Sequence, residues 1–260
     1  MTLTVSAIAD GAEIASASQS FALPERPAWA DSARGMHGRL MGPWTPVKAT
    51  GTQIRCWDRV YDFGGQVLPV SIASGGQELL DGPINLRAKV GTAMRKWENS
   101  TLRWLETTET HATAAITAES LLADARVRVT CEYDGLIRFD VKVDPRDGQP
   151  LSEVRVEIPV ATEFATHLQI ADGTAHGLVA QETAHQQHTH GFAPIVWLTG
   201  RERGLQWLCE SDDGWRLEDP KQALTVTPGR GQTRLVVTML DSELQPGQPF
   251  EASFALQATP

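Results

Sequence analysis

The chain has 260 residues, of which 41% are hydrophobic and 21% are charged, so one large domain or two small ones can bury a core. The formal net charge is −9 and no cluster of Lys and Arg is present, which argues against nucleic-acid binding. No apolar run approaches the roughly 18 residues that a membrane span requires. The first residues also lack the basic and apolar regions of a secretory signal. We therefore expect neither nucleic acid nor a membrane as a partner.

Residues 1–46 differ in character from the rest of the chain. Met1–Leu23 predicts one hairpin that turns at Asp10-Gly11. Trp29 and Trp44 follow, each next to prolines in irregular sequence, and disordered linkers seldom carry such large apolar groups. We expect this segment to lie over a domain and to be held there by its indole rings. The predicted boundary separates an N-terminal hairpin and segment, 1–46, from one domain, 47–260.

Residues 47–260 carry strand signals from end to end. Asp134-Gly135 separates two runs that alternate polar and apolar residues, Arg126–Tyr133 and Leu136–Val143, which is the strongest short hairpin signal. Val154–Val160 predicts another strand, with Pro159 at a sheet edge or a strand end. Further strands are expected at Thr52–Trp57, Val67–Ile72, Ile84–Ala88, Leu102–Thr107, Ala112–Ala118, Leu235–Leu240 and Phe250–Leu256.

Short strands at close intervals, separated by turn residues, predict an all-β fold. We expect a large antiparallel β-sandwich with an irregular N-terminal segment rich in Trp and Pro. The only candidate helix, Ala118–Ala125, is short, and 114–125 fits a strand followed by a loop equally well. The sequence leaves open whether the sheets form one sandwich or two lobes.

The stretch from Phe192 to Trp215 predicts a further hairpin, because Ala193–Thr199 and Leu205–Glu210 flank a charged turn that glycines close. It contains Trp197, Trp207 and Trp215. Aromatic pairs across strands stabilise a sheet by roughly 0.2–1 kcal/mol each, which favours a hairpin held in the core by its indoles. The alternative is a sugar platform on which one indole stays exposed for stacking.

The three cysteines, Cys56, Cys131 and Cys209, cannot all pair with one another, and their spacings match no zinc pattern. Buried thiols are one interpretation, and one disulfide with a leftover thiol is the other. The redox compartment stays open.

Two polar clusters are candidates for chemistry. On a strand, His188 and His190 would point the same way, and His185 and Glu182 are near them in sequence, so the group is a candidate metal site; a catalytic zinc site generally uses three protein ligands. The alternative is a polar loop, and we expect no metal and no other cofactor. If the strand before them continues, Glu210 and Asp212 share a face with carboxylates roughly 6–7 Å apart, a spacing found in glycosidases. Solvated acids at a strand end are the alternative, so we assign no catalytic residue.

Several motifs occur in a fixed order from about residue 24 to the end of the chain. They are Pro27-Ala28-Trp29, Pro43–Pro46, Trp57–Phe63, Leu68–Ile72, Gly76–Ile84, Glu132–Arg138, Leu151–Pro159, Pro194–Leu198, Arg203–Trp207 and Glu210–Trp215. In this order they resemble the N-terminal domain of glycoside hydrolase family 123-like proteins, which are β-N-acetylgalactosaminidase relatives. Asp58 and Thr199 stand where that family usually carries Gly.

The resemblance implies that this chain is a piece of a longer protein, or a short relative that lacks a catalytic (β/α) barrel. The acids of substrate-assisted cleavage belong to that barrel, and no residue here matches them. The implied function is a non-catalytic accessory β-sandwich that packs on or frames the barrel, and the family fits a periplasmic or extracellular location. The alternatives are a stand-alone carbohydrate-binding module that uses Trp29, Trp44 or Trp215, and a structural or assembly role.

Overall fold

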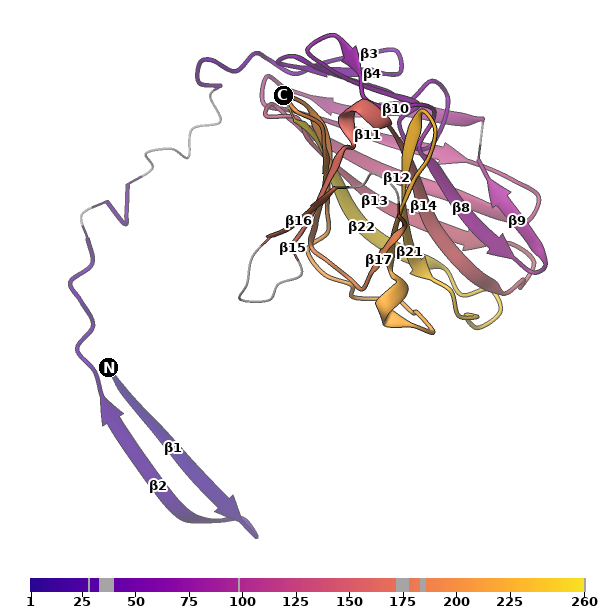
Figure 1. Ribbon diagram of the computed structural model, residues 1–260. Coiled ribbons are helices and arrows are strands. Elements are labelled where there is room, and N and C mark those ends of the chain that lie inside the picture. Colours follow the sequence, from indigo (N-terminus) through magenta and orange to yellow (C-terminus); the bar gives the residue numbers. More distant parts are fainter. Residues whose placement is uncertain (28, 33–39, 98, 172–177, 183–185, 260) are drawn as a thin grey trace. The chain divides into compact units, whose positions relative to one another are not determined.

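The computed structural model describes residues 1–27, 29–32, 40–97, 99–171, 178–182 and 186–259 (Figure 1). Of residues 178–182 it describes the backbone alone. The chain divides into two compact units, Met1–Gly38 and Arg39–Pro260. The helical elements among the described residues are two short 3-10 turns, η1 (Thr162–Phe164) and η2 (Pro220–Gln222). The predicted all-β fold is confirmed.

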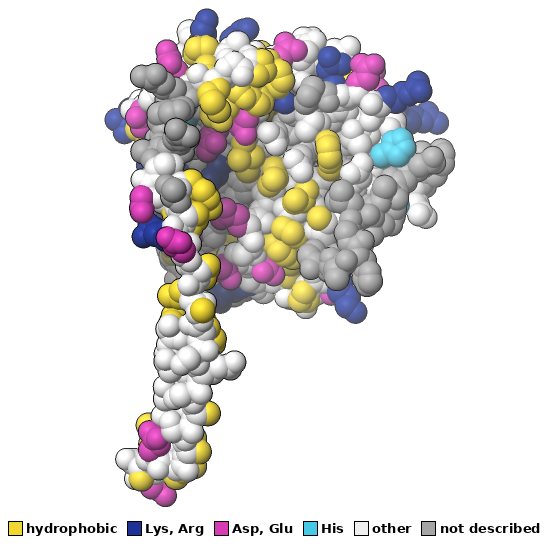
Figure 2. Space-filling model, turned by 90° about the vertical axis from the view of Figure 1, so that its left-hand side faces the viewer, with side chains coloured by type: hydrophobic (Ala, Val, Ile, Leu, Met, Phe, Trp, Pro, Cys, Tyr) yellow, Lys and Arg dark blue, Asp and Glu magenta, His cyan; other side chains and the backbone are white. Residues whose placement is uncertain are grey.

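The first unit is the expected hairpin of β1 (Thr2–Ala9) and β2 (Ala12–Ser20). Asp10 and Gly11 form its turn with φ values of 51° and 79°, the left-handed conformation that a tight hairpin turn requires. Every residue of both strands is exposed, including apolar side chains along the hairpin (Figure 2). Hydroxyl pairs such as Thr2–Ser20 connect the strands on one face.

The second unit contains three sheets whose strand pairs are antiparallel (Figure 1). The nine-stranded sheet has the order β10-β11-β12-β13-β22-β19-β18-β15-β16, and the six-stranded sheet has the order β17-β20-β21-β14-β8-β9. The strands of the nine-stranded sheet are β10 (Ser100–Thr107), β11 (His111–Ala118), β12 (Ala123–Glu132), β13 (Leu136–Pro145), β15 (His167–Ala171), β16 (Leu178–Glu182), β18 (Ile195–Thr199), β19 (Gly204–Leu208) and β22 (Phe250–Thr259).

The two larger sheets are the layers of a sandwich, and one cluster of buried apolar residues fills its interior. The strands of the six-stranded sheet are β8 (Asn85–Val90), β9 (Ala93–Lys96), β14 (Leu151–Ala161), β17 (His188–His190), β20 (Leu224–Pro228) and β21 (Gln232–Leu240). A third, five-stranded sheet consists of β3 (Lys48–Thr50), β4 (Gln53–Cys56), β5 (Arg59–Asp62), β6 (Ser71–Ser74) and β7 (Gln77–Glu78).

The predicted hairpin at Asp134-Gly135 is β12–β13, and its alternation determines which residues enter the core. Val129, Phe139 and their neighbours at every second position are buried, whereas Arg138 lies on the other face. Gly135 has a φ of 89°, as the turn requires.

The Trp57–Phe63 motif anchors the five-stranded sheet to the nine-stranded sheet. Arg59, only 5% exposed, donates from Nε to the carbonyl oxygen of Ala258 over 2.5 Å. The Tyr61 hydroxyl donates to the Gly135 carbonyl over 2.6 Å and accepts from the Ala258 amide over 3.3 Å. These bonds join residues 74 to 199 positions apart, so the motif has a structural role.

Two predictions of local secondary structure differ from the structure. The strand expected at Val67–Ile72 begins only at Ser71, because 67–70 form a connection, in which Val67 and Leu68 are nonetheless buried. The candidate helix Ala118–Ala125 is wrong: β11 ends at Ala118, a loop follows, and β12 begins at Ala123.

Pro159 lies in β14, an interior strand of the six-stranded sheet, so the edge alternative is wrong. The strand-end alternative holds, because β14 ends at Ala161 and its pairing with β8 has already stopped at Glu157. Beyond Glu157, β14 pairs with the segment around Leu80 instead, and there Pro159 accepts from the Asp81 amide through its carbonyl oxygen over 2.9 Å, which a proline can do without an N–H.

Candidate functional site

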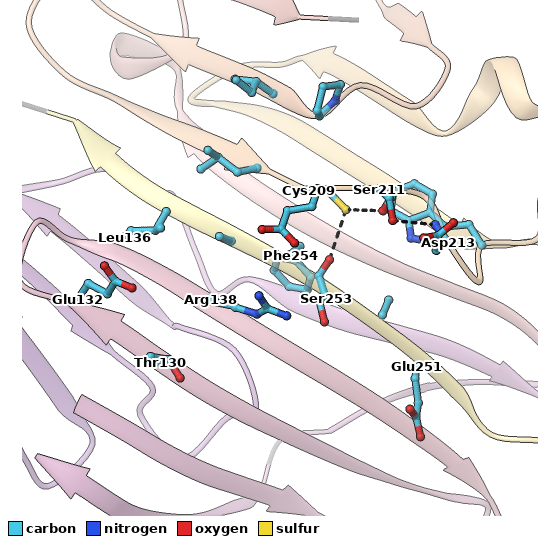
Figure 3. Close-up of a pocket in the computed structure, with 17 residues that line it drawn as sticks. Thr130, Glu132, Leu136, Arg138, Cys209, Ser211, Asp213, Glu251, Ser253 and Phe254 are labelled. Carbon is cyan, nitrogen blue, oxygen red and sulfur yellow. Dashed lines mark hydrogen bonds between the residues drawn. The ribbon is translucent and has the colours of Figure 1, made fainter. Parts of the chain in front are cut away.

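A pocket of about 710 Å³ lies on the outer face of the nine-stranded sheet (Figure 3). Side chains from β12, β13, β22, β19 and β18 line it, together with the segment that follows β19. We call it the outer-face pocket; its lining includes Thr130, Glu132, Leu136, Arg138, Ile195, Leu208, Glu210, Asp213, Trp215, Glu251, Ser253 and Ala255.

The floor of the pocket follows from strand register. Thr130 pairs with Arg138, Arg138 with Ala255, Ala255 with Leu208, and Leu208 with Ile195. Directly opposed residues point to the same face of a sheet, so these five side chains form one row across five strands. The row is polar at the β12–β13 end and apolar at the β18–β19 end.

Carboxylates outnumber cations around this floor. Glu132, Glu210, Asp213 and Glu251 line the pocket, against one guanidinium, that of Arg138. Arg138 is already engaged, since its Nε lies 2.9 Å from an Asp140 carboxylate oxygen, to which Ser253 also donates over 2.6 Å. A pocket of this charge favours ligands that donate hydrogen bonds and disfavours anions.

Glu210 and Asp213, beside the β19 end of the pocket, keep their carboxylates free of ion pairs with the described residues, as does Glu132 on β12. In the part of the chain that the structure describes, neither Glu210 nor Asp213 has a side-chain ion pair, whereas Glu251 binds Lys142 Nζ over 2.9 Å. Both are exposed, so their oxygens can accept hydrogen bonds from a bound molecule.

Trp215 forms an aromatic wall of the pocket. It is half-buried, and the edge-to-face contact with Phe192, at 5.5 Å between centroids and 90° between planes, fixes its ring. The other two tryptophans of this stretch lie elsewhere. Trp207 is fully buried and stacks on Phe254 at 4.4 Å, and Trp197 is half-buried on β18 opposite Gln206. The stretch therefore combines a core indole with a pocket indole.

Of the other two predicted sugar-stacking residues, Trp44 is in the same unit as the outer-face pocket but does not line it. Trp44 is half-buried and packs edge-on against Trp57 and Tyr133, with centroids 4.6 and 5.5 Å apart. Trp29 belongs to the first unit and is 74% exposed. Their roles in binding stay predictions.

The predicted acid pair does not form as expected. β19 ends at Leu208, and the chain turns so that the Trp215 amide donates to the Asp212 carbonyl over 2.9 Å. The alternation that would place Glu210 and Asp212 on one strand face therefore stops before them. Asp213, rather than Asp212, lines the pocket beside Glu210.

The histidine cluster is described in part. His188 and His190 lie on β17, which pairs with β20, and Nε2 of His188 and Nδ1 of His190 are buried without a hydrogen-bond partner. His185 lies outside the described residues. Among the described residues no group of three or more His, Cys, Asp or Glu is arranged to hold a metal ion. A metal site that includes His185 stays a prediction.

All three cysteines are buried free thiols, as one of the two interpretations expected. Burial raises the pKa of Cys209 to about 11. The Sγ atoms of Cys56 and Cys131 lie 3.9 Å apart.

Sequence reasoning missed Glu132, Arg138 and Glu251 as site residues. The alternating sequence pattern could have shown that each of them points outward from its strand. What was missing is that β13 lies beside β22 and that β22 lies beside β19, which places them around one pocket.

Fold and pocket together define the class: an antiparallel β-sandwich domain with a polar and aromatic pocket on the outer face of its larger sheet. The family model described as glycoside hydrolase 123, third domain, matches residues 47–214, and the chain belongs to this family. No curated protein matches the sequence. None of the described helices is long and apolar enough to cross a membrane.

Two solved structures superpose on much of the chain. The Slr1438 protein from Synechocystis sp. PCC 6803 superposes with a TM-score of 0.51 at 8% identity, covering 83% of this chain and 95% of that one. A putative aldose 1-epimerase from Escherichia coli K12 superposes with a TM-score of 0.47 at 9% identity, covering 82% of this chain and 98% of that one. At such identity the likeness to Slr1438 concerns the fold alone.

Proposed function

We propose that this chain is a non-catalytic accessory β-sandwich domain of a glycoside hydrolase of the N-acetyl-β-galactosaminidase type. In this proposal it packs on or frames a catalytic barrel that other sequence supplies. The observation that carries the proposal is the match of a third-domain model to residues 47–214, since a third domain belongs to a protein with further domains.

The local structure around Glu210 supports the non-catalytic part of the proposal. Glycoside cleavage requires two groups held at a defined separation across the scissile bond. Glu210 and Asp212 follow the end of β19, in a segment without strand pairing, so no ladder holds them in a common register.

The test is an assay of the purified chain with a chromogenic N-acetyl-β-galactosaminide. We expect no turnover above the buffer blank. A Glu210→Gln/Asp212→Asn double variant is the control: activity that persists in it comes from a contaminant. Activity of the wild-type chain that disappears in the double variant would overturn the non-catalytic assignment.

A second function, carbohydrate binding, is favoured by the outer-face pocket itself. We infer that a neutral or amino sugar would stack one apolar face on Trp215, because an indole offers a large contact area at low entropic cost. The Glu210 and Asp213 carboxylates are free to accept hydrogen bonds from sugar hydroxyls or an ammonium group. The excess of carboxylates argues against sulfated or uronic-acid glycans.

This candidate is tested by calorimetric titration of the chain with a panel of neutral, amino and acidic oligosaccharides. For a ligand that binds, we expect Trp215→Ala to weaken affinity by about tenfold or more, the scale of one lost aromatic contact. Trp29→Ala is the control, since this exposed indole belongs to the first unit and not to the sandwich that carries the pocket, and it should leave affinity unchanged. Loss of affinity in Trp29→Ala or Trp44→Ala, with Trp215→Ala unaffected, would move the binding site to those residues.

A further inference from the structure

Cys56 and Cys131 bring two thiols together across the boundary between two sheets. Cys56 is the last residue of β4 in the five-stranded sheet, and Cys131 lies on the inner side of β12 in the nine-stranded sheet. Their Sγ atoms are 3.9 Å apart, although the residues are 75 positions apart in sequence, and the two residues are 1% and 0% exposed. Cys209, by contrast, directs its thiol to the carbonyl oxygens of Ser211 and Ser253.

The two thiols have unequal acidity. The hydrogen bond with Cys131 lowers the pKa of Cys56; burial opposes this change, and the positive charge of Arg59 adds to it. For Cys131, the same hydrogen bond and burial both raise the pKa. Cys56 is thus the thiol that more readily becomes a thiolate, with Cys131 as its proton-bearing neighbour. Disulfide exchange uses one thiol as the first nucleophile and a second that resolves the intermediate.

We propose that Cys56 and Cys131 are a disulfide-forming pair, which closes when the folded chain meets a small disulfide oxidant such as glutathione disulfide. The Cys56 thiolate attacks one sulfur of the oxidant and displaces one glutathione thiolate, which gives a mixed disulfide. Cys131 then loses its proton and attacks Cys56 Sγ, which releases the second glutathione. Two cysteine thiols are oxidised, and one glutathione disulfide is reduced to two thiols.

The fold can accept the bond with a small movement. The sulfurs must close from 3.9 Å to the roughly 2.0 Å of a disulfide. Cys56 lies at the end of its strand, directly before Trp57, which has a φ of 49° in the β4–β5 turn and is 43% exposed. Cys131 is paired on both sides, with Ala112 on β11 and Ile137 on β13, so the β4–β5 turn beside Cys56 is the part that has to move for the sulfurs to meet and for the oxidant to enter.

The disulfide would link the five-stranded sheet covalently to the nine-stranded sheet, beside the hydrogen bonds that Arg59 and Tyr61 already make. It would enclose a long stretch of chain, and cross-links that close long loops restrict the unfolded state most. We expect the oxidised chain to melt about 5–15 °C above the reduced chain. The inference concerns the interior of the sandwich and does not depend on the proposed function.

The experiment incubates the folded chain with reduced or oxidised glutathione, removes the reagent, denatures the protein and alkylates free thiols before mass spectrometry. After oxidation we expect one alkylated cysteine instead of three. Proteolysis should then yield one cross-linked pair of peptides, which contain Cys56 and Cys131. Cys209→Ser, the matched control, should form the same cross-link and leave no alkylated cysteine. Cys56→Ser and Cys131→Ser should form no internal cross-link.

Peptide mapping of the wild-type chain keeps the test valid if a serine variant fails to fold. Three alkylated cysteines after oxidation would overturn the proposal, as would a cross-link that includes Cys209. A mixed disulfide with glutathione that persists on Cys56 would overturn it as well, because Cys131 would then have failed to resolve the intermediate. A cross-link that forms only in urea would equally contradict it, since the native geometry would not be its cause.

Discussion

On β13 and β22, successive residues point to opposite faces of the nine-stranded sheet, and the two faces differ in how their side chains are engaged. Inward, Phe139 stacks on Phe254 at 5.1 Å, and Phe254 stacks on Trp207 at 4.4 Å. Outward, Arg138 and Ser253 share Asp140, while nearby Glu210 and Asp213 keep free carboxylates. Inner residues have all of their neighbours inside this chain; outer residues keep hydrogen-bonding capacity for another molecule.

This difference predicts two kinds of mutational effect. Changes on the inner face and at the anchors below it should lower the free energy of unfolding. Changes on the outer face should leave that free energy nearly intact and alter binding. The following four predictions test this separation, from the largest expected effect to the smallest.

Trp207→Ala should have the largest effect, a loss of about 4 kcal/mol in the free energy of unfolding, because it removes a fully buried indole from the aromatic stack. Trp207→Phe should cost clearly less, since the indole Nε1 has no hydrogen-bond partner to lose and a ring is retained. Urea denaturation followed by circular dichroism measures both. A cost for the alanine variant below about 1.5 kcal/mol would contradict the assignment of Trp207 to the core.

Tyr61→Phe should cost about 1–2 kcal/mol at neutral pH, because it leaves the buried Gly135 carbonyl and Ala258 amide without their partner. Tyr133→Phe is the matched control and should cost less than about 0.5 kcal/mol. Burial raises the pKa of Tyr61 well above its usual value, so the unfolded chain releases this proton first as the pH rises.

The contribution of the Tyr61 proton is therefore complete below about pH 10 and is lost as the pH rises above it. We expect the stability difference between the wild-type chain and Tyr61→Phe to narrow above that pH in urea titrations. A difference that stays constant up to alkaline denaturation would show that the hydroxyl ionises equally well in both states.

Glu210→Gln should change the free energy of unfolding by less than about 0.5 kcal/mol, because the carboxylate has no ion-pair partner among the described residues. If the outer-face pocket binds amino sugars, the same variant should weaken that binding severalfold while neutral sugars lose less. Paired denaturation and calorimetry separate the two readouts. A large loss of stability would place Glu210 in the structural framework instead of the pocket.

Arg126→Ala should have the smallest effect, below about 0.5 kcal/mol, although Arg126 contacts Asp144 on the neighbouring strand. Its side chain is 55% exposed, and solvent screens such outer-face pairs. The unfolding midpoint of the variant should equal that of the wild-type chain at low salt, and again at high salt. A salt-dependent loss above 1 kcal/mol would show that the outer face contributes substantially to stability.

Local pattern was sufficient for much of this fold. The alternation in Arg126–Tyr133 and Leu136–Val143 and the Asp134-Gly135 turn predicted β12 and β13 and the face that each residue occupies, because strand side chains alternate with a period of two. The hairpin at Asp10-Gly11 and the pair of strands around the charged turn at Gly200–Gly204 were also readable. Short strands such as β3, β7 and β9 were missed, because tertiary pairing alone keeps them extended.

The candidate site and the thiol pair depended on the tertiary structure. No local sequence pattern predicts that β13 pairs with β22, that Arg59 donates to the Ala258 carbonyl, or that the Cys56 and Cys131 thiols are in contact. The sequence by itself determined the strands that alternate clearly, such as β12 and β13, with their turns and faces, because these depend on neighbouring residues. Only the folded chain decided which faces and ends come together, since contacts between residues far apart in sequence arise from packing the whole core at once.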